Sequence, residues 1–239
     1  MTALAGTLYW QGKWPDAMGP YTDALALYRE FGDESDVAEA LYNLSFTYAF
    51  TEDFDKAEEL LQESLGLSER LGDRIGIGRA YWGLGNMVSF RSDWDALTDY
   101  MHRATTEFEA LDRPFDLGWS YFMNGYGFAL SGETTDARRY LLKAMDIFAA
   151  VLDVSALTLI LEMYALVLVK EGDGLRAAQL AGAAHRLKAD TGVGIGDVSF
   201  NQYPELNEFL NAADEKTEEA YQEGHRLSVE DAIALAREA

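Results

Sequence analysis

The sequence predicts an all-α fold: a right-handed superhelical array of about five helix hairpins of 40 residues each, followed by C-terminal capping helices. Three observations lead to this prediction. Small and apolar residues recur with a period of 40 residues, turn-forming residues divide each period, and only 4 of the 239 residues are prolines. Because self-similarity at a fixed period is typical of repeat architectures, we expect similar hairpins that stack on one another.

The clearest part of the pattern is the second half of each period. We count from the first residue of each second half. In most periods a small residue lies three positions later, a large apolar residue seven positions later and a small residue ten positions later, as in Ala17, Tyr21 and Ala24. This spacing predicts one helical face that packs tightly on its neighbours. The five starts are Trp14, Phe54, Trp94, Thr134 and Gly174.

The first half of each period places a large residue directly before a small one, which lets another helix approach closely. These pairs are Leu4-Ala5, Leu44-Ser45, Leu84-Gly85, Asn124-Gly125 and Tyr164-Ala165. Turn formers separate the halves, and Gly32, Gly72 and Gly192 are predicted to end second helices in the left-handed conformation. Pro20 lies inside a predicted helix, so we expect that helix to be kinked or to start late.

This pattern resembles the tetratricopeptide (TPR) signature over residues 3 to about 191. The usual TPR period is about 34 residues, so the hairpins here are longer. Armadillo and HEAT arrays also have a period near 40 and are the alternative, although the small-residue pattern favours TPR. The predicted repeat region, residues 1–192, divides into 1–33, 34–73, 74–113, 114–153 and 154–192.

The pattern changes after Gly192. We expect a connector loop over residues 193–203 and capping helices over 204–239, the first running from Pro204 to about Glu223. Ser228 is predicted to cap a last helix, Val229 to Glu238, with Asp231 in the capping-box position. These helices would cover the apolar face of the fifth repeat.

The segments 181–192 and 220–236 resemble the C-terminal ends of bacterial, especially actinobacterial, ATPase-type regulators. In that family a LuxR-type or SARP-type helix-turn-helix domain, or a nucleotide-cyclase domain, accompanies a TPR sensor region. The resemblance implies a sensor region of a signal-transduction or transcriptional regulator. The first repeat begins in mid-helix, which suggests a piece of a longer protein. No P-loop, cyclase or helix-turn-helix signature is present, so a standalone protein stays open.

Composition excludes several classes of function. A formal charge of −22 disfavours direct contact with nucleic acid, and the lack of cysteine excludes disulfides and thiolate chemistry. The most apolar run, Leu157 to Val169, contains Glu162 and is too short to span a bilayer. We therefore expect a cytoplasmic protein without a membrane contact, and self-association stays open.

No residue pattern predicts catalysis, a metal or a cofactor. The histidines, His102, His185 and His225, have no partners at metal-ligand spacing. The glycines of 192–196 lack the Lys-Ser/Thr ending of a phosphate-binding loop, and no G-x-S-x-G or H-E-x-x-H motif occurs. We therefore expect a binding protein that is not an enzyme.

Residues one turn away from the packing positions of the first helices are predicted to line a concave groove. Aromatic rings with a few polar groups suit a small molecule or a peptide side chain, and Arg79 suits a carboxylate or phosphate. Two alternatives stay open: these rings pack on one another or on adjacent repeats, or the face docks a protein domain, including the parent protein's N-terminal domains. The predicted groove residues are Tyr42, Phe46, Phe50, Arg79, Trp82, Asn86, Phe90, Trp119, Phe122, Tyr126 and Glu162.

Overall fold

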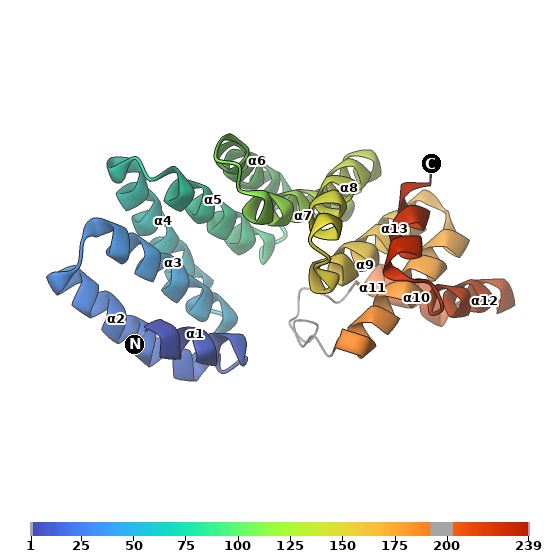
Figure 1. The fold of residues 1–239 in the computed structure, drawn as a ribbon, viewed down its shortest axis with the longest axis horizontal. Coiled ribbons are helices and arrows are strands. Elements are labelled where there is room, and N and C mark those ends of the chain that lie inside the picture. Colours follow the sequence, from blue (N-terminus) through green and yellow to red (C-terminus); the bar gives the residue numbers. More distant parts are fainter. Residues whose placement is uncertain (1, 192–202, 239) are drawn as a thin grey trace. The chain divides into compact units, whose positions relative to one another are not determined.

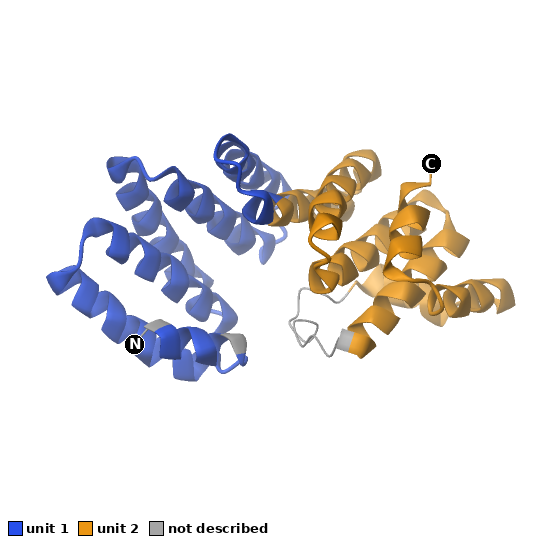
Figure 2. Cartoon of the chain, in the orientation of Figure 1, with its two compact units in different colours: residues 1–117 blue, residues 118–239 orange. Residues whose placement is uncertain are grey.

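The computed structural model describes residues 2–191 and 203–238, which form thirteen α-helices and, within those ranges, no strand (Figure 1). The chain divides into two compact units, residues 1–117 (unit 1) and 118–239 (unit 2), each described by itself below (Figure 2). The helices before the unit boundary are α1 (Thr2–Trp10), α2 (Trp14–Phe31), α3 (Glu34–Phe50), α4 (Phe54–Leu71), α5 (Arg74–Ser89) and α6 (Trp94–Ala110). The others are α7 (Pro114–Ser131), which contains the boundary, α8 (Thr134–Ala150), α9 (Val154–Glu171), α10 (Gly174–Thr191), α11 (Pro204–Asn211), α12 (Glu215–Gly224) and α13 (Val229–Arg237).

The helix starts follow the 40-residue period of the sequence. First helices begin at Glu34, Arg74, Pro114 and Val154, and second helices begin at the five predicted positions. Within the hairpins, α3 packs on α4, α5 on α6, and α9 on α10. The predicted class, an all-helical array of repeated hairpins, is confirmed.

The turn inside each hairpin uses the same left-handed backbone conformation. It occurs at Gly12, Gly132 and Gly172, with φ of 72°, 92° and 83°. Glu52 and Ser92 adopt it at the equivalent positions, with φ of 65° and 56°. Because the turn recurs every 40 residues, it is a property of the repeat rather than of one loop.

The turns that end the second helices follow the prediction only in part. Gly72 is left-handed, with φ of 66°, as predicted. Gly32 is extended, with φ of −88° and ψ of 178°, so the prediction was wrong there. Glycine fits this position for a different reason: a Cβ would lie 2.8 Å from the carbonyl oxygen of Tyr28. Gly192 lies outside the described residues.

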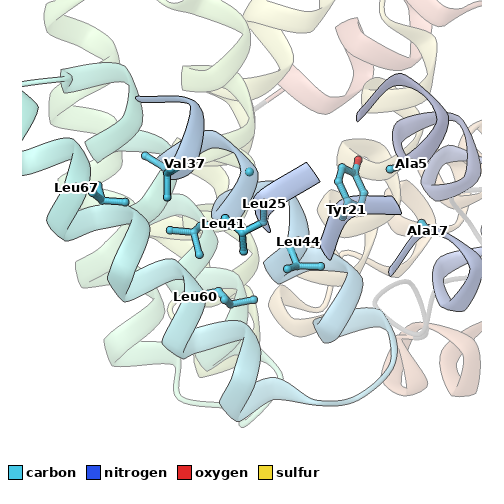
Figure 3. Packing of buried hydrophobic residues seen from close by; sticks show 11 residues of the cluster. Ala5, Ala17, Tyr21, Leu25, Val37, Leu41, Leu44, Leu60 and Leu67 are labelled. Atoms are coloured by element: carbon cyan, nitrogen blue, oxygen red, sulfur yellow. The ribbon is translucent and has the colours of Figure 1, made fainter. Parts of the chain in front are cut away.

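Small residues allow the helices of unit 1 to pack closely. Side chains from α1 to α4 form one buried apolar cluster, which includes Leu41 and Leu60 (Figure 3). In α5, a Cβ added to Gly83 would lie 2.5 Å from Cδ2 of Leu61 in α4. A larger residue would force these helices apart, because protein interiors are close-packed.

Helix α2 begins at Trp14 and runs through Pro20 to Phe31, so of the two expected outcomes, a kink or a late start, the late start does not occur. An interior proline removes one backbone hydrogen bond and disfavours a helix by about 3 kcal/mol. The buried side chains of Ala17, Tyr21 and Leu25 offset this effect through packing. Tertiary contacts therefore override the local preference.

The C-terminal part forms three short helices rather than the expected two. The predicted helix from Pro204 to Glu223 is interrupted between α11 and α12, because the side chain of Asp214 caps α12 by accepting from the amide of Thr217. Ser228 caps α13 as predicted, by accepting from the amide of Asp231. Helix α12 packs on α10, α11 on α9, and α13 on α8, α9 and α10. The predicted connector 193–203 lies outside the described residues, apart from Tyr203.

Candidate functional site

The predicted groove residues occupy equivalent positions in successive repeats. Tyr42, Trp82, Phe122 and Glu162 follow one another at intervals of 40 residues, on α3, α5, α7 and α9. Those up to Phe90 belong to unit 1, and those from position 119 onward belong to unit 2. The candidate site is therefore described in two parts.

Three aromatic rings of unit 1 form a continuous surface, the aromatic face, across α3 and α5. The ring of Phe46 lies 5.2 Å from that of Tyr42 and 5.7 Å from that of Trp82, between ring centroids. All three side chains are partly exposed. The structure thus brings together three of the predicted residues, and their rings remain within reach of a ligand.

Arg79 lies on the same side of α5 as Trp82, one helical turn earlier. Burial raises the pKa of the Tyr42 phenol above its usual value, while the nearby Arg79 guanidinium lowers it and Asp116 raises it. Tyr42 therefore keeps its proton at neutral pH and remains a hydrogen-bond donor.

Toward other described residues, the Arg79 guanidinium forms neither a hydrogen bond nor an ion pair, whereas Arg91 of the same unit pairs with acidic side chains.

The indole nitrogen of Trp82 is a second unused donor. It is buried and has no hydrogen-bond acceptor among the described residues. An unpaired buried donor is unfavourable by about 1–3 kcal/mol. Asn86 is different, because its Nδ2 donates to the carbonyl oxygen of Trp82 at 2.7 Å. The amide group that the sequence offered to a ligand is therefore engaged within α5.

Phe50 and Phe90 lie at the junctions between consecutive repeats. Phe50 stacks on Trp14, with ring centroids 4.6 Å apart, and Phe90 packs on Phe54 at 4.5 Å. The two pairs are equivalent, since each involves the first residue of a second helix. These two predicted groove residues therefore pack between repeats and do not extend the aromatic face.

In unit 2, two predicted groove residues pack on the unit's own core. Trp119 lies 5.1 Å from the buried ring of Phe148 and 5.8 Å from Phe122, between ring centroids. Phe122 is itself buried. For these positions the packing alternative describes the structure better than an open groove.

Glu162 is a buried carboxylate within an otherwise apolar stretch of α9. Its Oε1 atom lies 3.4 Å from Nε2 of His185 in α10, and its buried Oε2 atom has no hydrogen-bond partner among the described residues. Nδ1 of His185 lies 2.9 Å from the hydroxyl of Tyr221 in α12. A chain of polar groups thus links three helices of unit 2.

Tyr203, directly before α11, lies close to this carboxylate. Burial raises the pKa of its phenol well above the usual value, and the charges of Glu162 and Tyr126 raise it further. Its hydroxyl is buried and has no hydrogen-bond partner among the described residues. Burial likewise raises the pKa of Tyr126, the fourth predicted residue of this unit.

Sequence reasoning missed Tyr203 and His185. Tyr203 falls in the predicted connector, where no repeat period places a side chain, and His185 lies on a second helix, away from the predicted groove. The available signal was Glu162 itself, because a carboxylate in an apolar helix requires polar neighbours.

Over residues 2–191 and 203–238, no three His, Cys, Asp or Glu side chains gather in a way suited to a metal ion. In the same ranges, no helix is both long enough and apolar enough to cross a membrane.

Comparison with known proteins supports the repeat assignment. The family model of the tetratricopeptide repeat matches residues 1–70 and 36–102. No curated protein has significant sequence similarity to the chain.

Several solved structures share the fold. BtubC (BKLC) from P. vanneervenii has a TM-score of 0.68 and 19% identity, with 80% of this chain and 79% of that chain covered. TPR-like repeats described for a kinesin light chain of P. anserina give a TM-score of 0.60 and 13% identity, with coverages of 79% and 93%. Aspartyl phosphate phosphatase F from Bacillus subtilis has a TM-score of 0.68 and 16% identity. The match covers 99% of this chain but 58% of that chain. Residues 1–102 therefore resemble tetratricopeptide repeats, and the solved structures share the fold of repeated helix hairpins.

Proposed function

We propose that the chain is a non-catalytic TPR domain whose unit 1 binds a peptide or small molecule through an acidic group. The observation that carries this proposal is the pair of unused donors on one side of α5, the Arg79 guanidinium and the Trp82 indole N–H. The indole belongs to the aromatic face, and the Arg79 guanidinium lies near Tyr42 of the same face.

The chemistry of these donors favours a carboxylate or phosphate. A guanidinium presents a planar fork that matches two oxygens of such a group, and an indole nitrogen can only donate. The protonated phenol of Tyr42 adds a further donor. The rings of Tyr42, Phe46 and Trp82 offer an apolar surface to the rest of the ligand.

In the wider context, we assign this domain to the sensor region of a cytoplasmic bacterial signal-transduction or transcriptional regulator. The resemblance of segments 181–192 and 220–236 to the ends of such regulators supports the assignment. Ligand binding to the array would then shift the parent protein between two states. TPR folds are typical of interaction and regulatory domains, which agrees with a role without catalysis.

The proposal is tested with a panel of short peptides and small molecules that carry a carboxylate or phosphate, each paired with its neutral amide or ester. We expect the acidic member of a pair to raise the thermal midpoint of the chain. Arg79→Lys keeps the positive charge but loses the planar guanidinium. Trp82→Phe keeps an aromatic ring but loses the indole N–H donor. Each is expected to weaken binding by about 3- to 10-fold, the effect of one hydrogen bond.

Arg91→Lys is the matched control, because Arg91 lies in the same unit and pairs with Asp55 and Glu58. It should bind as the wild type does. Equal binding of acidic and neutral members, or an unchanged affinity in both Arg79→Lys and Trp82→Phe, would rule out this site.

A second candidate function is a scaffold that docks a partner domain. Large apolar side chains of unit 1 stay exposed near helix ends, with Phe31 at 76%, Leu71 at 45% and Phe115 at 58% exposure. Phe31 and Leu71 are equivalent positions, one repeat apart. For a scaffold, Phe31→Ser should abolish partner capture while Trp82→Phe leaves it intact, which is the reverse of the ligand-site result.

A further inference from the structure

A buried carboxylate in unit 2 has bonding capacity that the described residues leave unused. Glu162 is 5% exposed, and its Oε2 atom lacks a hydrogen-bond partner among them. Its Oε1 atom faces His185, and no Lys or Arg of the described ranges lies within ion-pair distance. Within ion-pair distance, His185 is the one described side chain that can carry a positive charge, and it faces Oε1 and leaves Oε2 without a donor. A buried oxygen without a donor is unfavourable, so the position calls for a further N–H donor.

A second unpaired polar atom belongs to the same neighbourhood. The Tyr203 hydroxyl is buried without a partner in the described part of the chain. Glu162 and Tyr126 both raise the pKa of the Tyr203 phenol, so each lies within electrostatic reach of Tyr203. Helix α11, which begins directly after Tyr203, packs on α9, which carries Glu162.

We propose that Glu162, together with Tyr126 and Tyr203, forms a binding site for a primary ammonium group. Such a group has three N–H donors. One donates a hydrogen bond to Glu162 Oε2, and another donates to the oxygen of the Tyr203 hydroxyl. Its charge compensates the carboxylate, and aromatic faces attract cations. A water molecule supplies hydrogen bonds but no positive charge.

Entry of the ligand requires a local shift, because Glu162 and Tyr203 are both buried. The Tyr203 hydroxyl has no hydrogen bond to lose among the described residues, so a shift of its ring breaks no polar contact of that hydroxyl. This inference goes beyond the proposed function of unit 1, because it concerns the other unit and a ligand of opposite charge.

The test is a thermal-unfolding titration of the full chain with methylammonium and ethylammonium chloride, compared with sodium chloride at equal ionic strength. Tetramethylammonium, which has no N–H donor, is the second reference. At about a hundred times the Kd, a primary amine should raise the midpoint by about 5–10 °C more than either reference. Glu162→Gln should lose this extra shift, and Tyr203→Phe should raise the Kd about 3- to 10-fold.

Glu208→Gln is the matched control, because it removes the same charge from an exposed position on α11. It should keep the full shift. The proposal is overturned when primary amines act no differently from the references, or when Glu162→Gln responds as the wild type does; the cluster then holds water only. Should Glu162→Gln fail to fold, an unchanged Kd in Tyr203→Phe overturns it. None of these outcomes affects the acidic-ligand test of unit 1.

Discussion

Single polar side chains with unused hydrogen-bonding capacity carry the functional proposals. Most polar groups in a packed protein are satisfied, as the hydroxyl of Ser64 is by the carbonyl of Ala38 at 2.8 Å. Some groups of the described residues are not satisfied, and the proposals use three of them: the donors of Arg79 and Trp82 in unit 1 and the acceptor of Glu162 in unit 2. The functional proposals rest on these atoms rather than on the number of aromatic rings.

Tyrosine ionisation predicts a loss of stability at alkaline pH. The pKa of Tyr42 is raised above its usual value of 10.0, mainly by burial. Its contribution is fully present below about pH 10 and is lost as the pH rises toward the folded-state pKa, because the unfolded chain releases its proton first. We expect Tyr42→Phe to reduce the fall in the free energy of unfolding above pH 10, measured by urea titration at several pH values. An equal fall in both proteins would contradict this.

Leu152 adopts the left-handed backbone conformation, which is unfavourable for leucine. Its φ is 53°, in the left-handed region, and it is 62% exposed. Asparagine tolerates this region better, so Leu152→Asn should raise the free energy of unfolding by about 0.5–1 kcal/mol. Leu175→Asn, at a similarly exposed position in α10, should bring no gain. Urea unfolding of both variants checks this, and equal effects would contradict it.

Contacts between helices repeat along the array. Arg103 lies over the ring of Tyr81 at 5.6 Å, and 40 residues later Lys143 lies over the ring of Tyr121 at 4.8 Å. Exposed ion pairs also connect repeats, for example Arg29 with Glu63, although each contributes only about 0–1 kcal/mol. Close packing at small residues is therefore the stronger determinant of the array.

Two glycine substitutions test this packing. A Cβ at Gly125 would lie 2.6 Å from Cγ of Leu141, so Gly125→Ala should lower the free energy of unfolding by about 1–3 kcal/mol. Gly66, inside α4, has only a flexible arginine end within 4.0 Å. Gly66→Ala should therefore stabilise the chain by about 0.5–1 kcal/mol. Chemical unfolding measures both, and effects of the same sign would contradict close packing at Gly125.

The cap of α13 is another local determinant. The Ser228 hydroxyl accepts from the amide of Asp231 and donates to its carboxylate at 2.8 Å. Ser228→Ala should destabilise α13 by about 1 kcal/mol, while Ser228→Thr should largely preserve the cap. Amide hydrogen exchange in α13 is the measurement, and equal protection in the two variants would contradict the role of the hydroxyl.

For the chain as a whole, periodicity made the fold predictable but not the site. Each hairpin follows from local features that recur, such as the small residue at Gly125 and the turn at Gly132. The site depends on which polar atoms stay unpaired after packing, and this is a non-local property. Phe50 and Phe90 share the pattern of the aromatic face, yet each packs on a neighbouring repeat. Tyr203 reaches Glu162 from outside the repeats, so no period could indicate it.

The most direct test of binding at unit 1 is the nuclear magnetic resonance signal of the Trp82 indole N–H, assigned among the 5 tryptophans by its loss in Trp82→Phe. This donor has no acceptor among the described residues. On titration with an acidic ligand from the panel, its proton signal should move downfield as the new hydrogen bond forms, and the neutral analogue should leave it in place. An unmoved Trp82 signal at saturating acidic ligand would contradict the proposed site.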